Sequence, residues 1–337
     1  MYAFFVIFGR SASTLLARLY YKKGGNSIWV AMLAQLAGFP ILIPCYCLSP
    51  PKSCTTNGQT KQPSALLLAL VYFSFGICLA AYSLMYSIGL LHLPVSTFSL
   101  ICASQLAFNA LFSFFLHSQK FTPFIINSLV LPTISSTLLI FQTDPSSHSE
   151  ASKGKYAIGF LCTIGASAGY GLMLSLAQLS FNKLLKGEAH AKVFEMVIYQ
   201  SLVATSTAIM GLFTSGEWKG SSIEMEEFEL GKFSYVMTLI ETAIASQFFV
   251  VGAIGLIFKV SSLFSNAISV LGLPVIPILA EIFFHDKMDA IKAIAMVLAI
   301  WGFVSYVYQC YLDNKSSKSE YKSSSEVSKS PLLEEVS

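Results

Sequence analysis

The fold is decided by residues 62–119, which read QPSALLLALVYFSFGICLAAYSLMYSIGLLHLPVSTFSLICASQLAFNALFSFFLHSQ. These fifty-eight residues contain no Asp, Glu, Lys or Arg. A soluble domain needs charged side chains on its surface, whereas a bilayer accepts helices of roughly 20 apolar residues that satisfy their own backbone hydrogen bonds. The stretch has room for two such helices, and Leu93-Pro94 marks the turn between them. The sequence therefore predicts a protein that crosses a membrane several times.

Charge-free runs recur elsewhere, at 24–51, 121–143, 156–182, 196–216, 260–280 and 293–312, and the run 233–258 is interrupted only by Glu241. Charged residues make up 12% of the chain, compared with about 25% in globular domains. The net charge of +3 is too small to argue for nucleic-acid binding. We expect an all-α integral membrane protein with ten transmembrane helices, at 2–20, 27–48, 65–91, 94–117, 121–141, 156–182, 192–214, 232–258, 261–284 and 290–312.

Two features indicate an internal duplication. Short and long connections follow one another in the same order in the two halves of the chain. A shift of 166 residues also lays the IGL of 88–90 on that of 254–256, and the same shift aligns Phe98 with Phe264. The matches are few, so chance similarity is the alternative. A duplicated unit of five helices must sit inverted in the membrane, as in many secondary transporters, whose substrate sites lie near the midplane.

The expected division of the chain follows from this duplication. Residues 1–141 form the first five-helix repeat, 142–155 the connecting loop and 156–312 the second repeat. Residues 313–337 are rich in Ser, Lys and Glu without periodicity, which is typical of disorder. We expect them to form a cytoplasmic tail.

The inventory of reactive residues argues against an enzyme. The four aspartates (144, 286, 289 and 313) and the five histidines (92, 117, 148, 190 and 285) all fall in loops or at helix ends. The chain has no HExxH, P-loop or GxGxxG motif, and its seven cysteines form no CxxC pair. We therefore expect no catalytic residues, no metal and no cofactor.

Uncharged polar side chains inside the expected helices are candidates for a substrate site: Tyr82, Tyr86, Gln105, Asn109, Gln178, Gln247 and Asn266. Gln105 and Asn109 are four residues apart and share a helix face, as do Tyr82 and Tyr86. Amides can bond to the edge of a planar heterocycle and tyrosines can cover its faces. The alternative is that each amide joins neighbouring helices by hydrogen bonds.

Ionisable groups at membrane depth are costly and therefore informative. Glu241 lies about nine residues into its helix and is the candidate proton-coupling carboxylate, with ion pairing or an interfacial position as the alternative. Arg10 lies roughly 13 Å along a helix that starts at Met1, close to half of a core about 30 Å thick. We expect Arg10 to face the central cavity, beside substrate or Glu241.

Several motifs resemble those of the plant purine permeases. They are LLARLYY (15–21), GGNSIW (24–29), QLAGFP (35–40), LPVSTFSLI (93–101), QLAFN (105–109), GLIF (255–258), SSLFSN (261–266), LPVIP (273–277), WGF (301–303) and SY (305–306). The resemblance covers nearly the whole chain. It departs at Arg10, because the family tends to carry an uncharged polar residue there.

The resemblance implies a drug/metabolite transporter-like fold of two inverted five-helix repeats, and a secondary active transporter of adenine, cytokinins or related nucleobase derivatives, coupled to protons. Its partners would be a purine-like solute, protons and the lipid bilayer, with no nucleic acid. The alternatives are a carrier of another small metabolite in the same superfamily and a membrane scaffold that transports nothing. We expect a multi-pass protein of the plasma membrane, with an endomembrane as the alternative.

Overall fold

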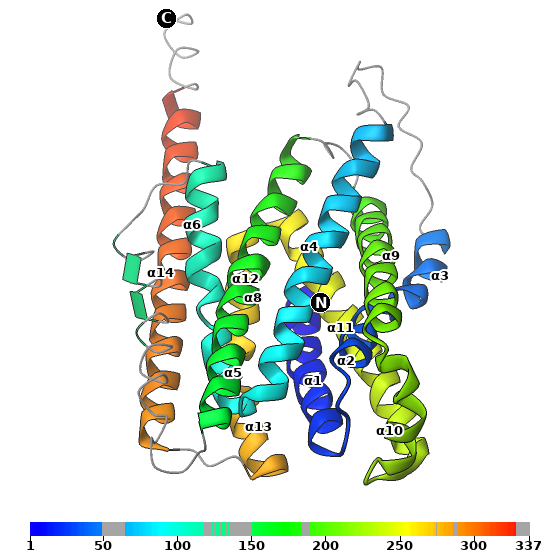
Figure 1. Cartoon of the computed structure of the whole chain (residues 1–337). Helices are drawn as coiled ribbons and strands as arrows, with labels where there is room; N and C mark the ends of the chain where they lie inside the picture. Colours follow the sequence, from blue (N-terminus) through cyan, green and yellow to red (C-terminus); the bar gives the residue numbers. More distant parts are fainter. Residues whose placement is uncertain are drawn as a thin grey trace, which may run out of the picture.

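The computed structural model describes residues 1–48, 65–117, six positions between 123 and 134, 150–183, 189–273, 275–285 and 289–327. Within these residues every regular element is a helix (Figure 1). The elements are α1 (Tyr2–Lys22), α2 (Ile28–Leu36), η1 (Phe39–Ile41), α3 (Leu42–Leu48), α4 (Ala65–His92), α5 (Val95–Cys102), α6 (Gln105–His117), α8 (Glu150–Lys183), α9 (Ala189–Ser215), η2 (Glu217–Lys219), α10 (Ser221–Glu227), α11 (Gly231–Lys259), α12 (Ser262–Gly272), α13 (Val275–Phe284) and α14 (Ala290–Val327).

The expected class, a helical protein that crosses a membrane several times, is confirmed. Within the described residues, seven helical spans are long and apolar enough to cross a bilayer, from Leu66–His92 to Ala290–Gln309. The shorter apolar segment Ile28–Pro44 and the charged helix α1 lie in the same bundle (Figure 1). The expected helix 121–141 falls mostly outside the described residues. A total of ten helices therefore stays a prediction.

Three of the expected helices are interrupted in the structure. The expected helix 27–48 is divided into α2, η1 and α3, where Pro40 removes a backbone donor. The expected helix 94–117 is divided into α5 and α6 by a tight turn, in which the Ala103 amide donates to the Leu100 carbonyl over 3.2 Å. The expected helix 261–284 is divided into α12 and α13, and the sequence between them contains Pro274. The break between α5 and α6 lies inside the bundle, because Cys102, Ala103 and Ser104 are buried.

The last helix is longer than expected. α14 continues past residue 312 to Val327, and residues 328–337 lie outside the described part of the chain. The division at 141, 155 and 312 stays a prediction.

α1 crosses α11 at close range, and glycine permits the approach. A Cβ atom on Gly9 would lie 2.5 Å from the backbone nitrogen of Phe249. A Cβ on Gly252, one turn along α11, would lie 2.8 Å from the backbone oxygen of Tyr2. Small residues allow such close approach in membrane helices, where packing rather than the hydrophobic effect holds helices together. α1 is therefore held firmly against α11.

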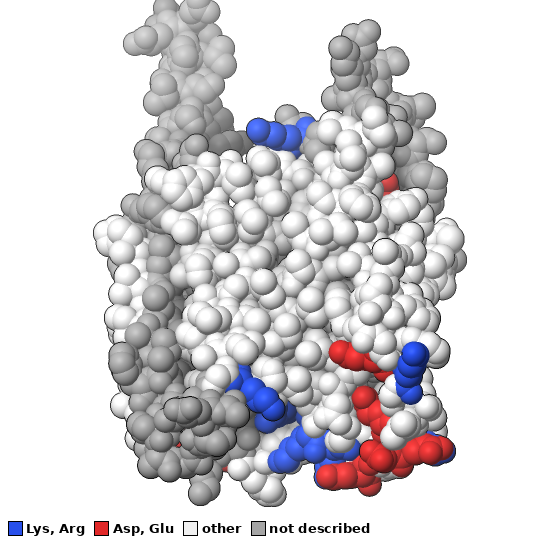
Figure 2. Space-filling view, viewed as in Figure 1, with Lys and Arg blue, Asp and Glu red and all other residues white. Residues whose placement is uncertain are grey.

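The outer surface has the polarity that a bilayer requires. In Figure 2, charged side chains gather toward the ends of the bundle, most densely around α10, and a broad band between them carries none on the described part of this face. Exposed residues on α11 include Phe233, which is 80% exposed, and Ile240, Ile244 and Phe248 one to two turns apart. An exposed apolar stripe of this kind suits contact with lipid tails.

Hydrogen bonds and an ion pair hold the connection between α1 and α2 at one end of the bundle. The Glu224 carboxylate on α10 accepts hydrogen bonds from the hydroxyls of Tyr20 and Tyr235 and from the backbone nitrogen of Ser27. Lys23 forms an ion pair with Glu229 at 2.8 Å. These contacts fix the α1–α2 connection on the segment between α9 and α11, and so fix two of the helices that line the cavity described below.

Candidate functional site

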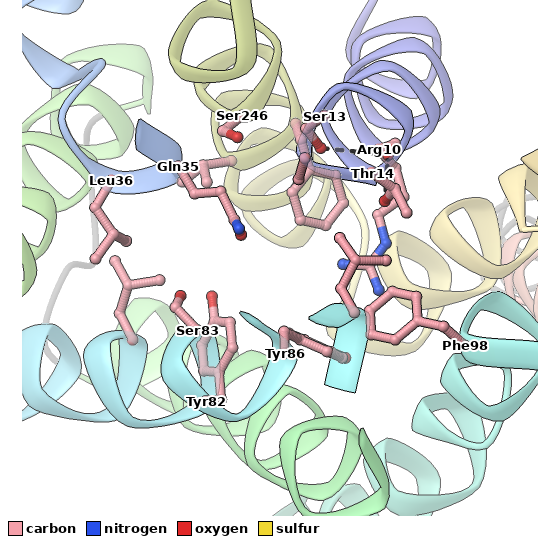
Figure 3. A pocket seen from close by; sticks show the side chains of 15 residues that line it. Arg10, Ser13, Thr14, Gln35, Leu36, Tyr82, Ser83, Tyr86, Phe98 and Ser246 are labelled. Atoms are coloured by element: carbon pink, nitrogen blue, oxygen red, sulfur yellow. Dashed lines mark hydrogen bonds between the residues drawn. The ribbon is translucent and has the colours of Figure 1, made fainter. Parts of the chain in front are cut away.

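A cavity opens between α1, α2, α4 and α11, with one side chain contributed by α5 (Figure 3). Its lining residues repeat at helical spacing, so each helix presents one face to it. The lining residues are Arg10, Ser13, Thr14 and Ala17 of α1, Gln35 and Leu36 of α2, Leu79, Tyr82, Ser83, Tyr86 and Leu90 of α4, Phe98 of α5, and Ser246, Phe249 and Val250 of α11.

Arg10 carries the only charge in this wall. Its side chain is 7% exposed, and its guanidinium carbon lies 5.1 Å from the centre of the Tyr86 ring. The rings of Phe249 and Tyr170 lie at 5.2 and 5.8 Å. These distances fall within the range of cation–π attraction, so three aromatic rings from α4, α8 and α11 surround the cation. The structure places Arg10 at the cavity, as its depth in the helix predicts, but Glu241 is not its neighbour.

The aromatic side chains form a continuous set. The ring of Tyr82 meets those of Tyr86 and Tyr170 edge-on, with centres 5.9 and 5.7 Å apart. The ring of Phe98 lies 5.8 Å from Tyr86, also edge-on. Edge-to-face packing of this kind holds rings in defined orientations. Tyr82 and Tyr86, two of the residues singled out from the sequence, therefore do lie together in the cavity wall.

Gln35 approaches the cavity from the side opposite Arg10. Its amide points into the open space, near the hydroxyl groups of Tyr82 and Ser83 (Figure 3). Within the described part of the chain, no other side chain forms a hydrogen bond with this amide. Gln35 was not among the site residues expected from the sequence. The available signal was its position in the QLAGFP motif that resembles the purine permeases.

Gln105 and Asn109 are fully buried and do not line the cavity. The Gln105 amide donates to the Ser269 hydroxyl over 3.2 Å, and its oxygen accepts from the Tyr86 hydroxyl over 3.3 Å. The Asn109 amide donates to the backbone oxygen of Ser262 over 3.1 Å, and its side-chain oxygen accepts from a serine of α8 over 2.7 Å. Gln105 thus joins α6 to α4 and α12, and Asn109 joins α6 to α8 and α12, which is the helix-joining alternative. Their role as substrate ligands stays a prediction.

Three other candidates also lie outside the cavity wall. The Asn266 amide donates to the backbone oxygen of Gln105 over 2.9 Å, and the Gln178 side-chain oxygen accepts from the Ser262 backbone nitrogen over 2.7 Å. Gln247 is buried on α11, with its stem beside the close approach of α2 at Gly38. Gln178 and Asn266 thereby extend the network around Gln105 and Asn109. A role in substrate binding stays a prediction for all three residues.

Glu241 lies on the exposed surface of α11, beside the apolar stripe that contains Ile240 and Ile244. Ser246 and Phe249, on another face of the same helix, line the cavity. Glu241 is thus separated from the cavity by the helix itself. Its role in proton coupling stays a prediction.

The chemistry of the cavity suits a flat, polar solute. Aromatic rings offer faces for stacking, Gln35 offers a donor and an acceptor in one plane, and the serine and threonine hydroxyls can do either. Among the lining residues there is no carboxylate, and the described residues hold no cluster of metal-ligating side chains. Pockets with apolar walls and a few well-placed polar groups are typical of small-molecule sites.

Comparison with known proteins adds an independent finding. A family model described as purine nucleobase transmembrane transport matches residues 1–316. Purine permease 21 of Arabidopsis thaliana is 58% identical over 318 residues, which are 94% of this chain and 82% of that protein. Probable purine permease 10 of the same plant is 56% identical over 96% of this chain and 83% of its own length. A solved crystal structure matches at a TM-score of 0.52 and 14% identity, covering 90% of this chain and 97% of its own, and so shows likeness of fold alone.

Proposed function

Because this chain belongs to the purine permease family of transmembrane nucleobase transporters, we propose that it is a secondary active transporter that carries adenine, cytokinins or related nucleobase derivatives by proton symport. The family match covers residues 1–316 and the relatives are permeases, so the protein is a transporter rather than an enzyme.

The observation that supports this function best is the composition of the cavity. A purine is flat and carries ring nitrogens that both donate and accept hydrogen bonds. The rings of Tyr82, Tyr86 and Phe249 supply faces for such a base, and the amide of Gln35 supplies a bidentate edge. Stacking of a base on an aromatic side chain contributes about 1–3 kcal/mol in other proteins. We assign Tyr82, Tyr86, Arg10 and Gln35 to the substrate, with the network around Gln105 behind them.

Transport requires that the site open to each side of the membrane in turn, and an inverted repeat supplies a mechanism for this. In the expected inverted repeat, α1 of the first half corresponds to α8 of the second half, and α4 corresponds to α11. The pairs α1–α11 and α4–α8 are the two most extensively packed helix pairs, and exchange of the two halves converts one pair into the other. The two pairs lie side by side in Figure 1. This packing supports two inverted halves of five helices that rock about the cavity.

Proton coupling requires a group that changes its protonation during the cycle. Glu241 is the single acidic residue of the long helix α11, far from both of its ends, and its side chain is exposed. Because Glu241 does not touch the cavity, we propose that it acts by changing the position of α11, whose Ser246 and Phe249 line the cavity.

We propose that the protein lies in the plasma membrane, with an endomembrane as the alternative.

The experiment that tests this function is uptake of radiolabelled adenine by cells that have no purine uptake of their own. Cells producing the chain should accumulate adenine saturably, and unlabelled cytokinin, pyridoxine and caffeine added in turn should show which solutes compete. A protonophore should abolish accumulation. Cells that carry the chain at normal abundance and still take up no more adenine than controls would contradict the proposal.

A further inference from the structure

Arg10 is a buried cation without a matching anion. The side chain is 7% exposed, and its Nε and Nη2 atoms are buried with no hydrogen-bond acceptor among the described residues. The ionisable groups that face it are the phenols of Tyr86 and Tyr170 and the thiol of Cys102, all of types that are neutral near pH 7. No carboxylate pairs with Arg10 or lines the cavity in the described part of the chain.

Burial of the Arg10 guanidinium costs free energy unless an anion or another acceptor compensates its charge. Cations inside membrane proteins almost always pair with an anion or with backbone oxygens, because the surroundings solvate them poorly. The rings of Tyr86, Phe249 and Tyr170 attract the guanidinium, but cation–π attraction offsets only part of the lost hydration. Two of the three guanidinium nitrogens, Nε and Nη2, also have no acceptor among the described residues. The missing partner is therefore an anion that enters the cavity.

The rest of the cavity restricts what that anion can be. On the side opposite Arg10, the polar groups of Gln35, Tyr82 and Ser83 are all uncharged (Figure 3). Leu79, Leu90 and Phe98 are apolar. A solute that suits both sides is flat, negative at one edge and neutral but polar at the other. A guanidinium fork binds two adjacent acceptor atoms better than one, as in a carboxylate or an ionised N–C=O group.

We propose that this transporter prefers purine-like heterocycles in anionic form, with the negative edge bound by Arg10 and the neutral edge read by Gln35. The proposal rests on the proposed function and narrows its substrate class. An oxopurine that loses a ring proton places its charge over a ring nitrogen and the neighbouring carbonyl oxygen, which matches the guanidinium fork. Neutral purines are carried with lower apparent affinity, and a solute with a cationic edge is repelled.

The test compares two oxopurines of different charge in liposomes that contain the purified protein. Urate is anionic at neutral pH, and hypoxanthine is neutral. The unaltered protein should take up urate with at least tenfold higher apparent affinity than hypoxanthine. Arg10→Gln should lose at least tenfold for urate and less than threefold for hypoxanthine. Arg10→Lys, which keeps the charge and loses the fork, should be intermediate.

Arg18→Gln is the matched control, since Arg18 lies two turns further along α1, outside the cavity wall, with a 2.8 Å hydrogen bond to the Leu90 backbone oxygen. It should keep the preference for urate. The thermal stability of each purified variant, with and without urate, separates loss of binding from loss of folding, because only proteins that bind urate should be stabilised by it.

Three results would overturn or redirect the account. Equal affinity for both solutes, or an unchanged preference in Arg10→Gln, overturns the anion proposal while hypoxanthine uptake preserves the proposed function. Hypoxanthine uptake that disappears when chloride is replaced by gluconate also overturns it, because chloride would then be the partner of Arg10. Absence of any purine uptake by a folded protein contradicts the proposed function itself.

Discussion

The ring of Tyr86 lies 5.1 Å from the guanidinium carbon of Arg10 and covers one side of a cation that is buried at the wall of the cavity. The hydroxyl of the same tyrosine donates to the side-chain oxygen of Gln105 over 3.3 Å. One side chain therefore connects the cavity wall with the network of amides behind it. The predictions below separate the parts played by the ring, the amides, the helix crossing and the carboxylate.

The ring of Tyr86 should contribute more than its hydroxyl. Tyr86→Phe removes a long hydrogen bond worth about 1 kcal/mol or less, so apparent substrate affinity should fall less than fivefold. Tyr86→Ala removes a stacking surface worth about 1–3 kcal/mol, so affinity should fall by about 5-fold to 150-fold. The control is Tyr199→Ala, because Tyr199 is exposed on α9 and stacks on Tyr72 away from the cavity. A Tyr86→Ala protein with unchanged apparent affinity would place the solute elsewhere.

Gln35→Leu and Gln105→Leu make the same substitution on two sides of the cavity wall. Gln35 faces open space, so its replacement should weaken substrate binding by about 1–3 kcal/mol and leave the melting temperature unchanged. Gln105 bonds to Ser269 and Tyr86, so its replacement leaves buried partners unsatisfied and should lower the free energy of unfolding by a similar amount. Uptake kinetics and thermal unfolding in detergent measure the two effects.

The opposite pattern would change the assignment of the amides. A Gln105→Leu or Asn109→Leu protein with normal thermal stability and collapsed uptake would show that these amides bind the solute, as first expected from their shared helix face. In that case the cavity of the substrate-bound state must include residues that now lie behind its wall.

The crossing of α1 and α11 at Gly9 should tolerate no side chain. Gly9→Val places carbon atoms against the backbone of α11, where a Cβ alone would lie 2.5 Å from the Phe249 nitrogen, and overpacking of this kind costs about 1–3 kcal/mol. The variant should melt at a lower temperature and lose uptake. Gly154→Val on α8 is the control, since its Cβ would meet no atom within 4 Å. Equal stability of the two variants would contradict the described crossing.

Glu241→Gln tests proton coupling. The substitution removes the charge and keeps the shape, so the variant should still exchange internal for external substrate but should lose accumulation driven by an inward proton gradient. Glu226→Gln is the control, because Glu226 is an exposed acid on α10 whose pKa is lowered by the hydrogen bond with Lys232. Steep accumulation at acidic pH in the Glu241→Gln protein would assign coupling to another group.

The sequence predicted the fold class well because charge-free runs of membrane length have few other uses. The long helices α4, α8, α9 and α11 lie within a few residues of their expected limits, apart from the earlier start of α8 at Glu150. The interruption at Ala103 could not be placed, because the segment stays apolar across the break and periodicity alone cannot locate one. The break between α12 and α13 did have a signal in Pro274. Pro40 did carry a signal, since proline removes a backbone donor.

The candidate site was predicted in part, for a different physical reason. Buried amides look alike in sequence whether they bind a solute or another helix, and only packing distinguishes Gln35, which faces the cavity, from Gln105, which faces α12. Arg10 could be placed because charge at that depth has few alternatives to a cavity. The same argument from depth was applied to Glu241, but this residue lies on the exposed outer surface of α11. Depth along a helix does not specify which face of the helix a side chain occupies.

Whether this protein is a proton-driven purine transporter is tested most directly in liposomes that contain only the purified chain. The measurement is uptake of radiolabelled adenine with and without an inward proton gradient. We expect saturable uptake that the gradient drives above equilibrium, and at least about a fivefold higher half-saturation concentration in Tyr86→Ala than in Tyr199→Ala. Adenine entry no faster than into empty liposomes, with a folded protein in the membrane, would contradict this function.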